Sequence, residues 1–430
     1  MKLNELKNKK ILILGFGREG MDNFKFLREL FPDKTLGIAD QKIYPIFYDR
    51  RKKGIGKKLG RVRLHLGRNY LKALKDYDVI IKSPGIPFKI LRRSDLRKLT
   101  SQTEIFLENC PGKIVGITGT KGKSTTASLI YQVLKQAGLK AHLVGNIGKP
   151  VLNLLFSATP KDVYVYELSS HQLYNLKKSP QIAVFLNIFP EHLDYYRNFK
   201  EYVNAKANIT KYQTGRDFLI YNQKDKIVKG IAKKSRAKKI PIKGEYYDLN
   251  RKAGRAVGKI FKIPSKIIEK AIREFKPLPH RLELVGTFKG ITFYNDALST
   301  IPETAILAMK ALGKRVQTVF LGGFDRKIDF KKLAKFIIKN KNIRNIIFFP
   351  TTGEKIWKEI LRQANLSGVR HSWRPFFVDN MRDGVKLAYK HTEKGKICLL
   401  SCASTSFSIF RDYKEKGNLF KKYVKKYGKA

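Results

Sequence analysis

The chain has 430 residues, of which 43% are hydrophobic and 11% aromatic. A chain of this length and composition is globular, not disordered, and holds about three domains of ordinary size. Lys and Arg total 89 against 35 Asp and Glu, a net charge of +54. This charge predicts a positive surface that attracts phosphates, nucleic acid or anionic membranes. Because it is spread through every segment and no nucleic-acid motif accompanies it, nucleic-acid binding is an alternative and not the main prediction.

The cysteines and the apolar runs bear on the cellular compartment. The chain has three cysteines, Cys110, Cys398 and Cys402, whose spacing matches neither a zinc site nor a C-x-x-C redox motif. The N-terminal apolar run is too short for a signal peptide. No run approaches the length of about 18 apolar residues that a membrane-spanning helix needs. We therefore predict a cytoplasmic protein without membrane insertion.

The chain begins with the pattern of a nucleotide-binding βα unit. A predicted strand over residues 10–14 leads into the turn Gly15-Phe16-Gly17-Arg18-Glu19-Gly20, and a second predicted strand over residues 35–39 ends at Asp40. The G-x-G-x-x-G spacing is typical of turns that bind a diphosphate at a helix N-terminus. Taken alone, this turn also permits a dehydrogenase.

A second turn, Ser83-Pro84-Gly85-Ile86-Pro87, follows a predicted strand over residues 78–81. Ligands of open α/β sheets bind outside the carboxyl ends of the strands. The turn is therefore a candidate ligand site, and an ordinary loop is an equal alternative.

A phosphate-binding loop separates a predicted strand ending at Thr118 from a predicted helix ending at Gln136. Its sequence is Gly119-Thr120-Lys121-Gly122-Lys123-Ser124-Thr125, a shortened form of the G-x-x-x-x-G-K-[ST] loop. The glycines let the backbone approach an anion, and Lys123 reaches toward the terminal phosphates. Ser124 or Thr125 would hold Mg²⁺. A dehydrogenase leaves this loop unexplained.

Three polar residues after the loop suit metal chemistry. Glu167 ends a predicted strand over residues 163–166, where a Mg²⁺ ligand is needed beside a phosphate loop. His192 follows a predicted strand over residues 183–187, and Lys206 lies on a predicted helix that begins at Phe199. An isolated histidine is more often structural than a ligand, so the combination carries the prediction.

In this order and rough spacing, the features resemble the Mur ligases and their folylpolyglutamate synthetase relatives. The resemblance covers nearly the whole chain and rests on the blocks Gly119–Thr125, Gly145–Gly148, Glu167–Ser170, Asn187, Glu191–Asp194, Ala205-Lys206, Leu278–Glu283, Tyr294–Glu303, Leu321–Arg326 and Leu399–Tyr413. Within the family, the chain looks like the branch that adds D-glutamate to UDP-N-acetylmuramoyl-L-alanine.

The resemblance implies an α/β fold of three domains. They are a Rossmann-like UDP-substrate-binding domain over residues 1–102, a central P-loop ATPase domain with a parallel sheet over 103–279, and a Rossmann-like amino-acid-binding domain over 280–430. Closure of the third domain would involve a hinge near Leu278-Pro279.

The implied protein is a monomeric ATP-dependent ligase of cytoplasmic peptidoglycan precursor synthesis, which works through an acyl phosphate. Another Mur-type or folylpolyglutamate synthetase-like ligase is the main alternative. The Asp-Asn-Pro-Arg signature of diaminopimelate- or lysine-adding relatives is absent from the chain, which favours D-glutamate.

Carried over residue by residue, the resemblance implies four groups of site residues. The catalytic residues are Lys123, Glu167, His192 and Lys206. The ATP-binding residues are Gly119, Thr120, Lys121, Gly122, Lys123, Ser124, Thr125, Asn250, Arg281 and Asp296. The UDP-substrate-binding residues are Gly15, Phe16, Arg18, Asp40, Gly85 and Asn146, and the amino-acid-binding residues are Thr300, Arg326, Ser406 and Tyr413. Two Mg²⁺ ions are implied, held by Ser124, Thr125, Glu167, His192 and Lys206, with Lys206 carbamylated by CO₂.

The chain departs from the family pattern at three places. Tyr246–Asn250 keeps only the last asparagine of a His-Asn-x-x-Asn block, Ala297-Leu298 replaces a common Ser-Lys, and Ser401–Ala403 lacks the usual proline. The phosphoryl-transfer residues are complete.

Overall fold

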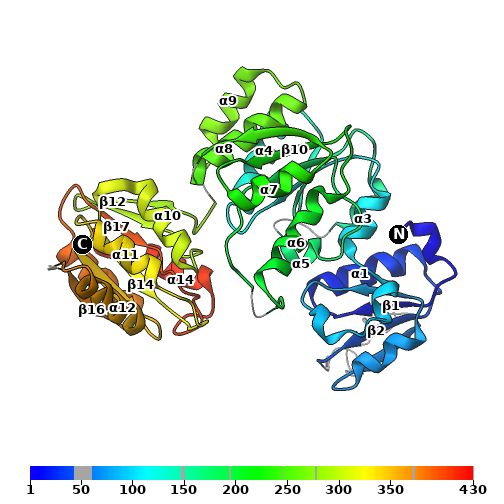
Figure 1. The fold of residues 1–430 in the computed structure, drawn as a ribbon, viewed down its shortest axis with the longest axis horizontal. Helices are drawn as coiled ribbons and strands as arrows, with labels where there is room; N and C mark the ends of the chain where they lie inside the picture. Colours follow the sequence, from blue (N-terminus) through cyan, green and yellow to red (C-terminus); the bar gives the residue numbers. More distant parts are fainter. Residues whose placement is uncertain are drawn as a thin grey trace. The chain divides into compact units, whose positions relative to one another are not determined.

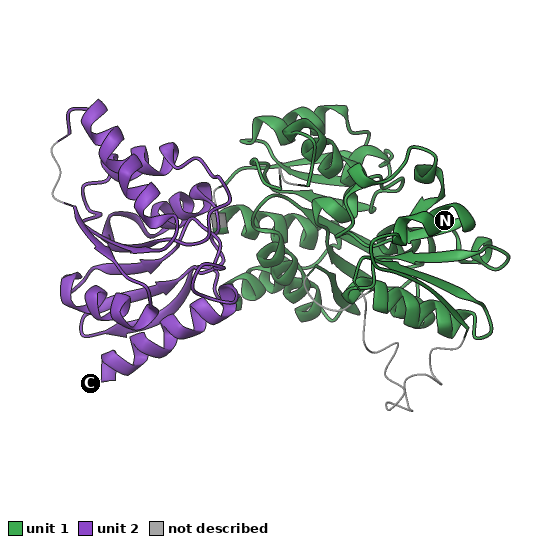
Figure 2. Ribbon diagram, turned by 90° about the horizontal axis from the view of Figure 1, so that it is seen from below, with its two compact units in different colours: residues 1–275 green, residues 276–430 purple. Residues whose placement is uncertain are grey.

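The computed structural model describes residues 1–42, 61–146, 151–192, 195–244, 246–276, 278–369 and 373–429. The chain forms two compact units, Met1–Phe275 and Lys276–Ala430 (Figure 2). Across the described residues there are three sheets (Figure 1). The predicted α/β fold is confirmed. The predicted boundaries after residues 102 and 279 stay predictions.

The N-terminal sheet has the order β3-β2-β1-β4-β5. Its elements and the adjoining helices are η1 (Leu3–Leu6), β1 (Ile11–Leu14), α1 (Arg18–Leu30), β2 (Leu36–Asp40), β3 (Val62–Leu66), η3 (Tyr70–Asp76), β4 (Val79–Lys82), η4 (Phe88–Ile90), η5 (Asp95–Lys98), β5 (Leu99–Thr100) and α3 (Gln102–Asn109). The paired strands are parallel.

The strand order of this sheet reverses at β1. Ile11 lies opposite Leu36 of β2 on one side and Val79 of β4 on the other. Strand β1 is a continuous apolar run that is fully buried, as expected for a parallel sheet covered on both faces. Both glycine turns therefore lie at the carboxyl ends of neighbouring strands, which is where such sheets bind ligands.

The central sheet, also in the first unit, has the order β11-β10-β9-β6-β8-β7 with parallel pairs. Its elements are β6 (Lys113–Thr118), α4 (Lys123–Gln136), β7 (Ala141–Gly145), η6 (Leu152–Ser157), β8 (Val163–Glu167), α5 (Ser170–Leu173), β9 (Ile182–Phe185), α6 (Phe199–Lys211), β10 (Phe218–Asn222), α7 (Lys226–Lys234), β11 (Lys238–Ile242), α8 (Tyr246–Ile260) and α9 (Ser265–Glu274).

Helix α4 is held by its apolar face. Leu129, Ile130 and Val133 belong to the same buried cluster as Ala253 and Val257 of α8. Complete burial of such a side chain contributes about 1.5–3 kcal/mol. This packing holds the N-terminus of α4 near the carboxyl end of β6, so that the phosphate loop lies between the two elements.

The second unit contains the sheet β12-β13-β17-β14-β15-β16. Its elements are β12 (Glu283–Phe288), β13 (Ile291–Asn295), α10 (Pro302–Leu312), η7 (Gly313–Arg315), β14 (Val316–Gly322), α11 (Lys331–Lys339), β15 (Asn345–Phe349), α12 (Gly353–Leu366), β16 (Arg374–Phe377), α13 (Met381–His391), β17 (Ile397–Leu400) and α14 (Tyr413–Lys429). Strands β12 and β13 pair in antiparallel fashion, and the other pairs are parallel.

Candidate active site

A cavity of about 790 Å³ lies within the first unit. It is lined from both sheets, by residues of the two N-terminal turns and by residues that follow strands of the central sheet. Eight of the predicted site residues line it: Gly15, Arg18, Asp40, Gly85, Lys123, Asn146, His192 and Lys206. Residues that are far apart in the sequence are thus gathered around one space of the size that small-molecule sites have.

The phosphate loop is organised around the N-terminus of α4. Gly122 caps the helix with φ of +87°, and Gly119 has φ of +158°. A Cβ on Gly119 would lie 3.0 Å from Leu186 Cβ. Backbone angles that side chains rarely adopt and close packing both require glycine here.

Lys123 Nζ donates hydrogen bonds to Gly119 O at 2.8 Å and Thr120 O at 2.9 Å. Asn187, which follows β9, holds the loop backbone in place: its Oδ1 accepts from Lys121 N and its Nδ2 donates to Lys121 O. Ser124 and Thr125 lie in the first turn of α4 and are buried. Asn250 lies beside the loop, where its Oδ1 accepts from Thr126 Oγ1 at 2.9 Å.

Lys121 forms an ion pair with Glu191, with Nζ and Oε1 2.8 Å apart. Burial raises the pKa of the Glu191 carboxyl, but the charges of Lys121, Lys123 and His192 outweigh burial and lower it to about 2. The pair joins the phosphate loop to the segment that carries His192.

Glu167 is buried at the carboxyl end of β8, with 1% of its surface exposed. Its Oε1 accepts a hydrogen bond from Asn146 Nδ2 at 2.9 Å. Among the residues that the structure describes, its Oε2 has no hydrogen-bond partner. A buried carboxylate oxygen without a partner is costly, and a cation at that oxygen would compensate the cost.

Lys206 is fully buried on α6 and donates to Gly119 O at 2.9 Å. Its ammonium group also lies 5.1 Å from the centroid of the Tyr202 ring. Burial, and after it the charge of Lys123, hold the pKa of Lys206 well below its usual range. The neutral amine, which is the nucleophilic form, is therefore favoured more strongly than in an exposed lysine.

His192 has φ of +58°, and its Nε2 lies 3.9 Å from Glu191 Oε2. Burial lowers the pKa of His192, and the nearby lysines add to this effect while Glu191 opposes it. The neutral imidazole is the form that binds metals. Over the described part of the chain, no group of three or more His, Cys, Asp or Glu is placed to hold a metal ion. Leu193-Asp194 and Ile147-Gly148 of the predicted motifs lie outside the described residues, as does the side chain of Tyr246.

Short hydrogen bonds organise the first N-terminal turn and link it to the second. Asp40 Oδ2 accepts from Phe16 N at 2.6 Å and its Oδ1 accepts from Lys42 N at 2.8 Å. Ser83 Oγ donates to Gly15 O at 2.7 Å. A Cβ on Gly85 would meet no atom of the described residues within 4 Å. Asp40 therefore shapes the first turn, and Gly85 presents open space on the second.

The remaining predicted residues belong to the second unit. Thr300 follows β13, Ser406 follows β17 and Arg326 follows β14. These three strands are neighbours, so the three residues lie at one edge of the sheet. Ser406 Oγ is buried and has no hydrogen-bond partner in the described part of the chain, whereas Arg326 is exposed. Tyr413 begins α14, and its ring lies 5.9 Å from that of His280.

Asp296 is buried at the end of β13 and organises the segment that contains Arg281. Its carboxylate accepts from Leu282 N at 3.0 Å, from Ser401 Oγ at 2.9 Å and from the Ser299 hydroxyl. Burial raises the pKa of Asp296 to about 6, although these donors oppose the rise. A nucleotide contact from Asp296 or Arg281 stays a prediction.

Sequence reasoning assigned no role to Tyr202 or Glu191. The Tyr202 hydroxyl lies 2.9 Å from Thr120 Oγ1, so it contacts the phosphate loop as well as Lys206. Tyr202 and Lys206 are four residues apart on α6 and share one face of it. This spacing is a signal that would have found Tyr202.

The family model of the Mur ligase middle domain matches residues 117–286, the segment that holds the phosphate loop, Glu167, His192 and Lys206. The chain belongs to the Mur ligase family.

Individual relatives cover nearly the whole chain. The UDP-N-acetylmuramoylalanine–D-glutamate ligase of Acetivibrio thermocellus is 31% identical over 98% of each chain. The enzyme of the same name from Clostridium kluyveri is 31% identical over 97% of each chain. The MurF ligase of Thermotoga maritima, solved in complex with ADP, has a TM-score of 0.58 at 15% identity and covers 99% of this chain and 98% of its own. At that identity the likeness concerns the fold alone.

None of the helices in the described ranges combines the length and the apolar character needed to cross a membrane.

Proposed function

We propose that the protein is an ATP-dependent ligase that joins D-glutamate to UDP-N-acetylmuramoyl-L-alanine in cytoplasmic peptidoglycan precursor synthesis. One observation carries the proposal: a single cavity of about 790 Å³ is lined both by the N-terminal glycine turns and by Lys123, His192 and Lys206. This arrangement supports the proposal, because the cavity would accept a diphosphate beside the phosphates of ATP. Relatives named for this reaction match the chain over nearly its full length.

In the proposed division, residues 1–102 hold the UDP part of the substrate, 103–279 hold ATP and 280–430 hold the amino acid. Gly15, Arg18 and Gly85 face the cavity, and the open space at Gly85 lets a ligand approach the backbone. Asp40 keeps the first turn in shape through Phe16 N. Asn146 lines the same cavity between these residues and Glu167.

The first step is phosphoryl transfer. An oxygen of the alanyl carboxylate attacks the γ-phosphorus of ATP, the bond from this phosphorus to the β,γ-bridging oxygen breaks, and ADP leaves. Negative charge spreads over the phosphoryl oxygens, so the protein contributes mainly by positioning and by cations. Lys123 exchanges its bonds to Gly119 O and Thr120 O for the β- and γ-phosphates.

The residues present fit Mg²⁺, which supplies charge neutralisation at the phosphate oxygens when it is bound. Glu167 offers a buried carboxylate oxygen without a partner, and Ser124 or Thr125 offers a hydroxyl at the start of α4. Oxygen donors of this kind suit Mg²⁺. His192 would hold a second ion.

Lys206 contributes after its amine reacts with CO₂. The electron pair of the neutral amine forms a bond from Nζ to the carbon of CO₂, one C=O π bond becomes a C–O⁻ bond, and the nitrogen loses a proton, so that the amine becomes an anionic carbamate. The lowered pKa of Lys206 supports this reaction, because only the neutral amine has the electron pair that it needs. The carbamate would then hold the second Mg²⁺ together with His192.

The second step forms the amide. The amine nitrogen of D-glutamate attacks the carbonyl carbon of the acyl phosphate, phosphate leaves with the electrons of the C–O bond, and the nitrogen loses a proton. Arg326, Thr300, Ser406 and Tyr413 would bind the amino acid, since a dicarboxylate needs a cation and hydroxyl donors.

The test is phosphate release from ATP and Mg²⁺ with UDP-N-acetylmuramoyl-L-alanine and a panel of amino acids that includes D- and L-glutamate. We expect release that depends on D-glutamate. Release with another amino acid or another UDP-linked acceptor would replace the proposal by a related ligase. Salt-sensitive nucleic-acid binding without turnover would overturn it.

A matched pair of variants on α4 tests the phosphate loop. Lys123→Ala should lower kcat by about 10²-fold or more, because it removes a cation aimed at the transferred phosphoryl group. Lys135→Ala changes an exposed lysine in the last turn of the same helix and should leave kcat unchanged.

A further inference from the structure

The side chain of Tyr195 contacts the Ser83–Pro87 turn. Its hydroxyl donates to Pro84 O at 3.0 Å and to Ile86 O at 2.9 Å. The tyrosine belongs to the segment after β9 of the central sheet, whereas Pro84 and Ile86 belong to the turn after β4 of the N-terminal sheet. One side chain therefore joins the ATP side of the cavity to its UDP side.

Lys82 and Tyr195 hold the turn at Ser83–Pro87 by donating hydrogen bonds to its carbonyl oxygens. Lys82 Nζ donates to Ile86 O at 2.7 Å and to Ser83 O at 3.0 Å, so Ile86 O accepts from both Lys82 and Tyr195. In a trans peptide the N–H points away from the C=O. Fixing Pro84 O therefore directs the Gly85 N–H away from Tyr195, at a residue that has open space in front of it.

Tyr195 also contacts His192, directly and through His171. Tyr195 N donates to His192 O at 3.0 Å, and His192 has the rare φ of +58°. The Tyr195 ring lies 4.2 Å from the ring of His171, which itself lies 4.8 Å from His192. Both histidines and Tyr195 line the cavity. A displacement of the turn thus reaches His192 through one backbone hydrogen bond and two ring contacts.

We propose that Tyr195 is a positioning residue that couples the uridine-diphosphate site at the Ser83–Pro87 turn to the nucleotide and metal site at His192. The inference rests on the proposed function, because that function assigns the UDP group to the turn. A ligand at either site would order the hydrogen bonds that Tyr195 makes to the turn and to His192. Each ligand would therefore raise the affinity for the other by the same factor.

Calorimetric titration of the full-length protein tests the coupling without turnover. The probes are UDP and the non-hydrolysable β,γ-imido analogue of ATP with Mg²⁺. In the wild type, saturating UDP should tighten binding of the analogue by about fivefold or more. In Tyr195→Phe, each ligand should still bind alone, and the factor should fall toward one. Tyr212→Phe, which removes a hydroxyl from a 42% exposed side chain at the end of α6, should keep the wild-type factor.

Tyr195→Phe keeps the ring contacts and loses only the hydrogen bonds of the hydroxyl, so its melting temperature should fall by a few degrees at most. A purely structural role would show this small fall and leave the factor unchanged. Retention of the factor in Tyr195→Phe, independent binding in the wild type, or no UDP binding would each overturn the inference.

The two proposals fail in different ways. Amino-acid-dependent phosphate release without coupling in the wild type would remove only the role of Tyr195. Coupling that depends on Tyr195, without phosphate release for any amino acid, would remove only the ligase proposal.

Discussion

Lys206 is deeply buried, which is unfavourable for a side chain that normally carries a positive charge. Its side chain is 1% exposed, yet within the described ranges its ammonium group meets a backbone carbonyl and a hydroxyl and no carboxylate at hydrogen-bond distance. Burying a cation in this way is unfavourable, and the lowered pKa reflects that. Conversion of the amine to an anion beside bound cations would remove this cost.

We expect Lys206→Ala to lose ligase activity and acetate to restore part of it, because a free carboxylate can occupy the space that the carbamate would fill. The measurement is the rate of phosphate release across an acetate series. Lys211→Ala, at an exposed position on the same helix, should retain activity and show no response to acetate. Full activity of Lys206→Ala without acetate would contradict this role.

The Lys121–Glu191 pair predicts how stability depends on pH. The pKa of Glu191 is lowered from 4.5 to about 2, so its contribution is present above pH 4.5 and is lost as pH falls toward 2. We expect the free energy of unfolding to fall more steeply in this range for the wild type than for Glu191→Gln.

Urea unfolding at several pH values measures the difference. Lys121→Met removes the partner instead of the acid, and it should also flatten the wild-type slope. Parallel pH profiles for the wild type and both variants would show that the pair does not contribute.

Individual residues differ in how far the sequence predicts them. Lys123 and Glu167 follow from local order, since Glu167 ends a strand and Lys123 starts the helix that follows a strand through a short glycine turn. Tyr195 and Lys82 act through carbonyl groups of the Ser83–Pro87 turn, and the turn itself has no side chain that specifies these partners. Lys82 is within a few residues of the turn, but Tyr195 reaches it only because two sheets pack together.

At the scale of elements, the first turn and α1 depend on a close backbone approach. A Cβ on Gly20 would lie 2.1 Å from Gly15 O, whereas a Cβ on Gly17 would meet no atom within 4 Å. Gly20→Ala should therefore destabilise the protein by about 1–3 kcal/mol through overpacking. Gly17→Ala, in the same turn, should have a much smaller effect.

Denaturant unfolding of both variants provides the measurement, and UDP binding adds a second reading. Gly20→Ala should also weaken UDP binding, because α1 must move away from the turn to make room. Equal stabilities of the two variants would contradict the packing argument.

Elements with strong patterns were predicted to within one or two residues. Strand β1 (Ile11–Leu14) and helix α4 (Lys123–Gln136) agree with the predicted segments, and helix α6 (Phe199–Lys211) begins at the predicted residue. Buried apolar runs and helix-starting residues determine these elements locally. The order of the strands in each sheet was not predicted, since it depends on pairing between distant segments. The central position of β6 between β8 and β9 is what brings Glu167 and His192 to the phosphate loop.

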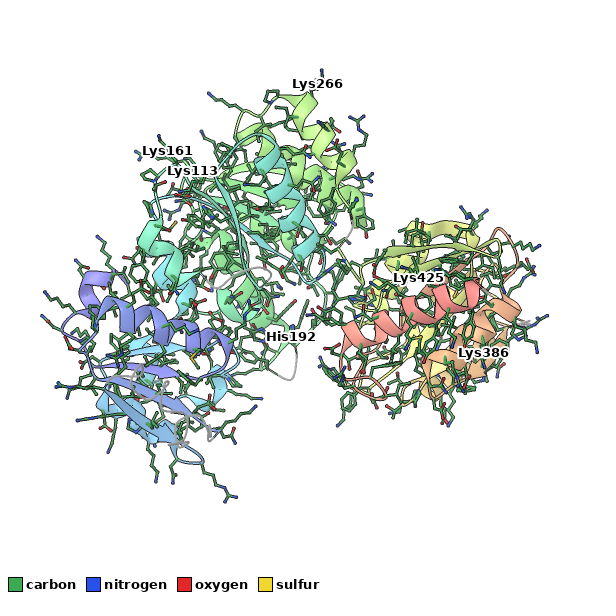
Figure 3. The ribbon with its side chains drawn as sticks, turned by 180° about the vertical axis from the view of Figure 1, so that it is seen from behind. Lys113, Lys161, His192, Lys266, Lys386 and Lys425 are labelled. Carbon is green, nitrogen blue, oxygen red and sulfur yellow. The ribbon has the colours of Figure 1, made fainter. Side chains whose placement is uncertain are left out.

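At the scale of the whole molecule, the charge of +54 is carried by both units. Lys113, Lys161 and Lys266 of the first unit and Lys386 and Lys425 of the second, labelled in Figure 3, are all exposed. Charge that is spread in this way attracts anionic substrates from all directions.

We therefore expect kcat/KM for the UDP-linked substrate to fall as ionic strength rises from about 0.05 to 0.5 M, because screening shortens the range of the attraction. The value of kcat should change little, since contacts within the cavity are shorter than the screening length. Steady-state kinetics in NaCl and in KCl separates screening from effects of one ion. A kcat/KM that is constant across both series would contradict electrostatic steering.

The carbonyl of Gly119 accepts hydrogen bonds from Lys123 and Lys206. In the proposed mechanism, phosphate that binds Lys123 would displace the first of these bonds, and the departure of ADP would let it form again. The protein thus regains internal contacts at the moment of product release, which opposes retention of ADP. Because the same bonds must be broken for ATP to bind, they lower the affinity for both nucleotides.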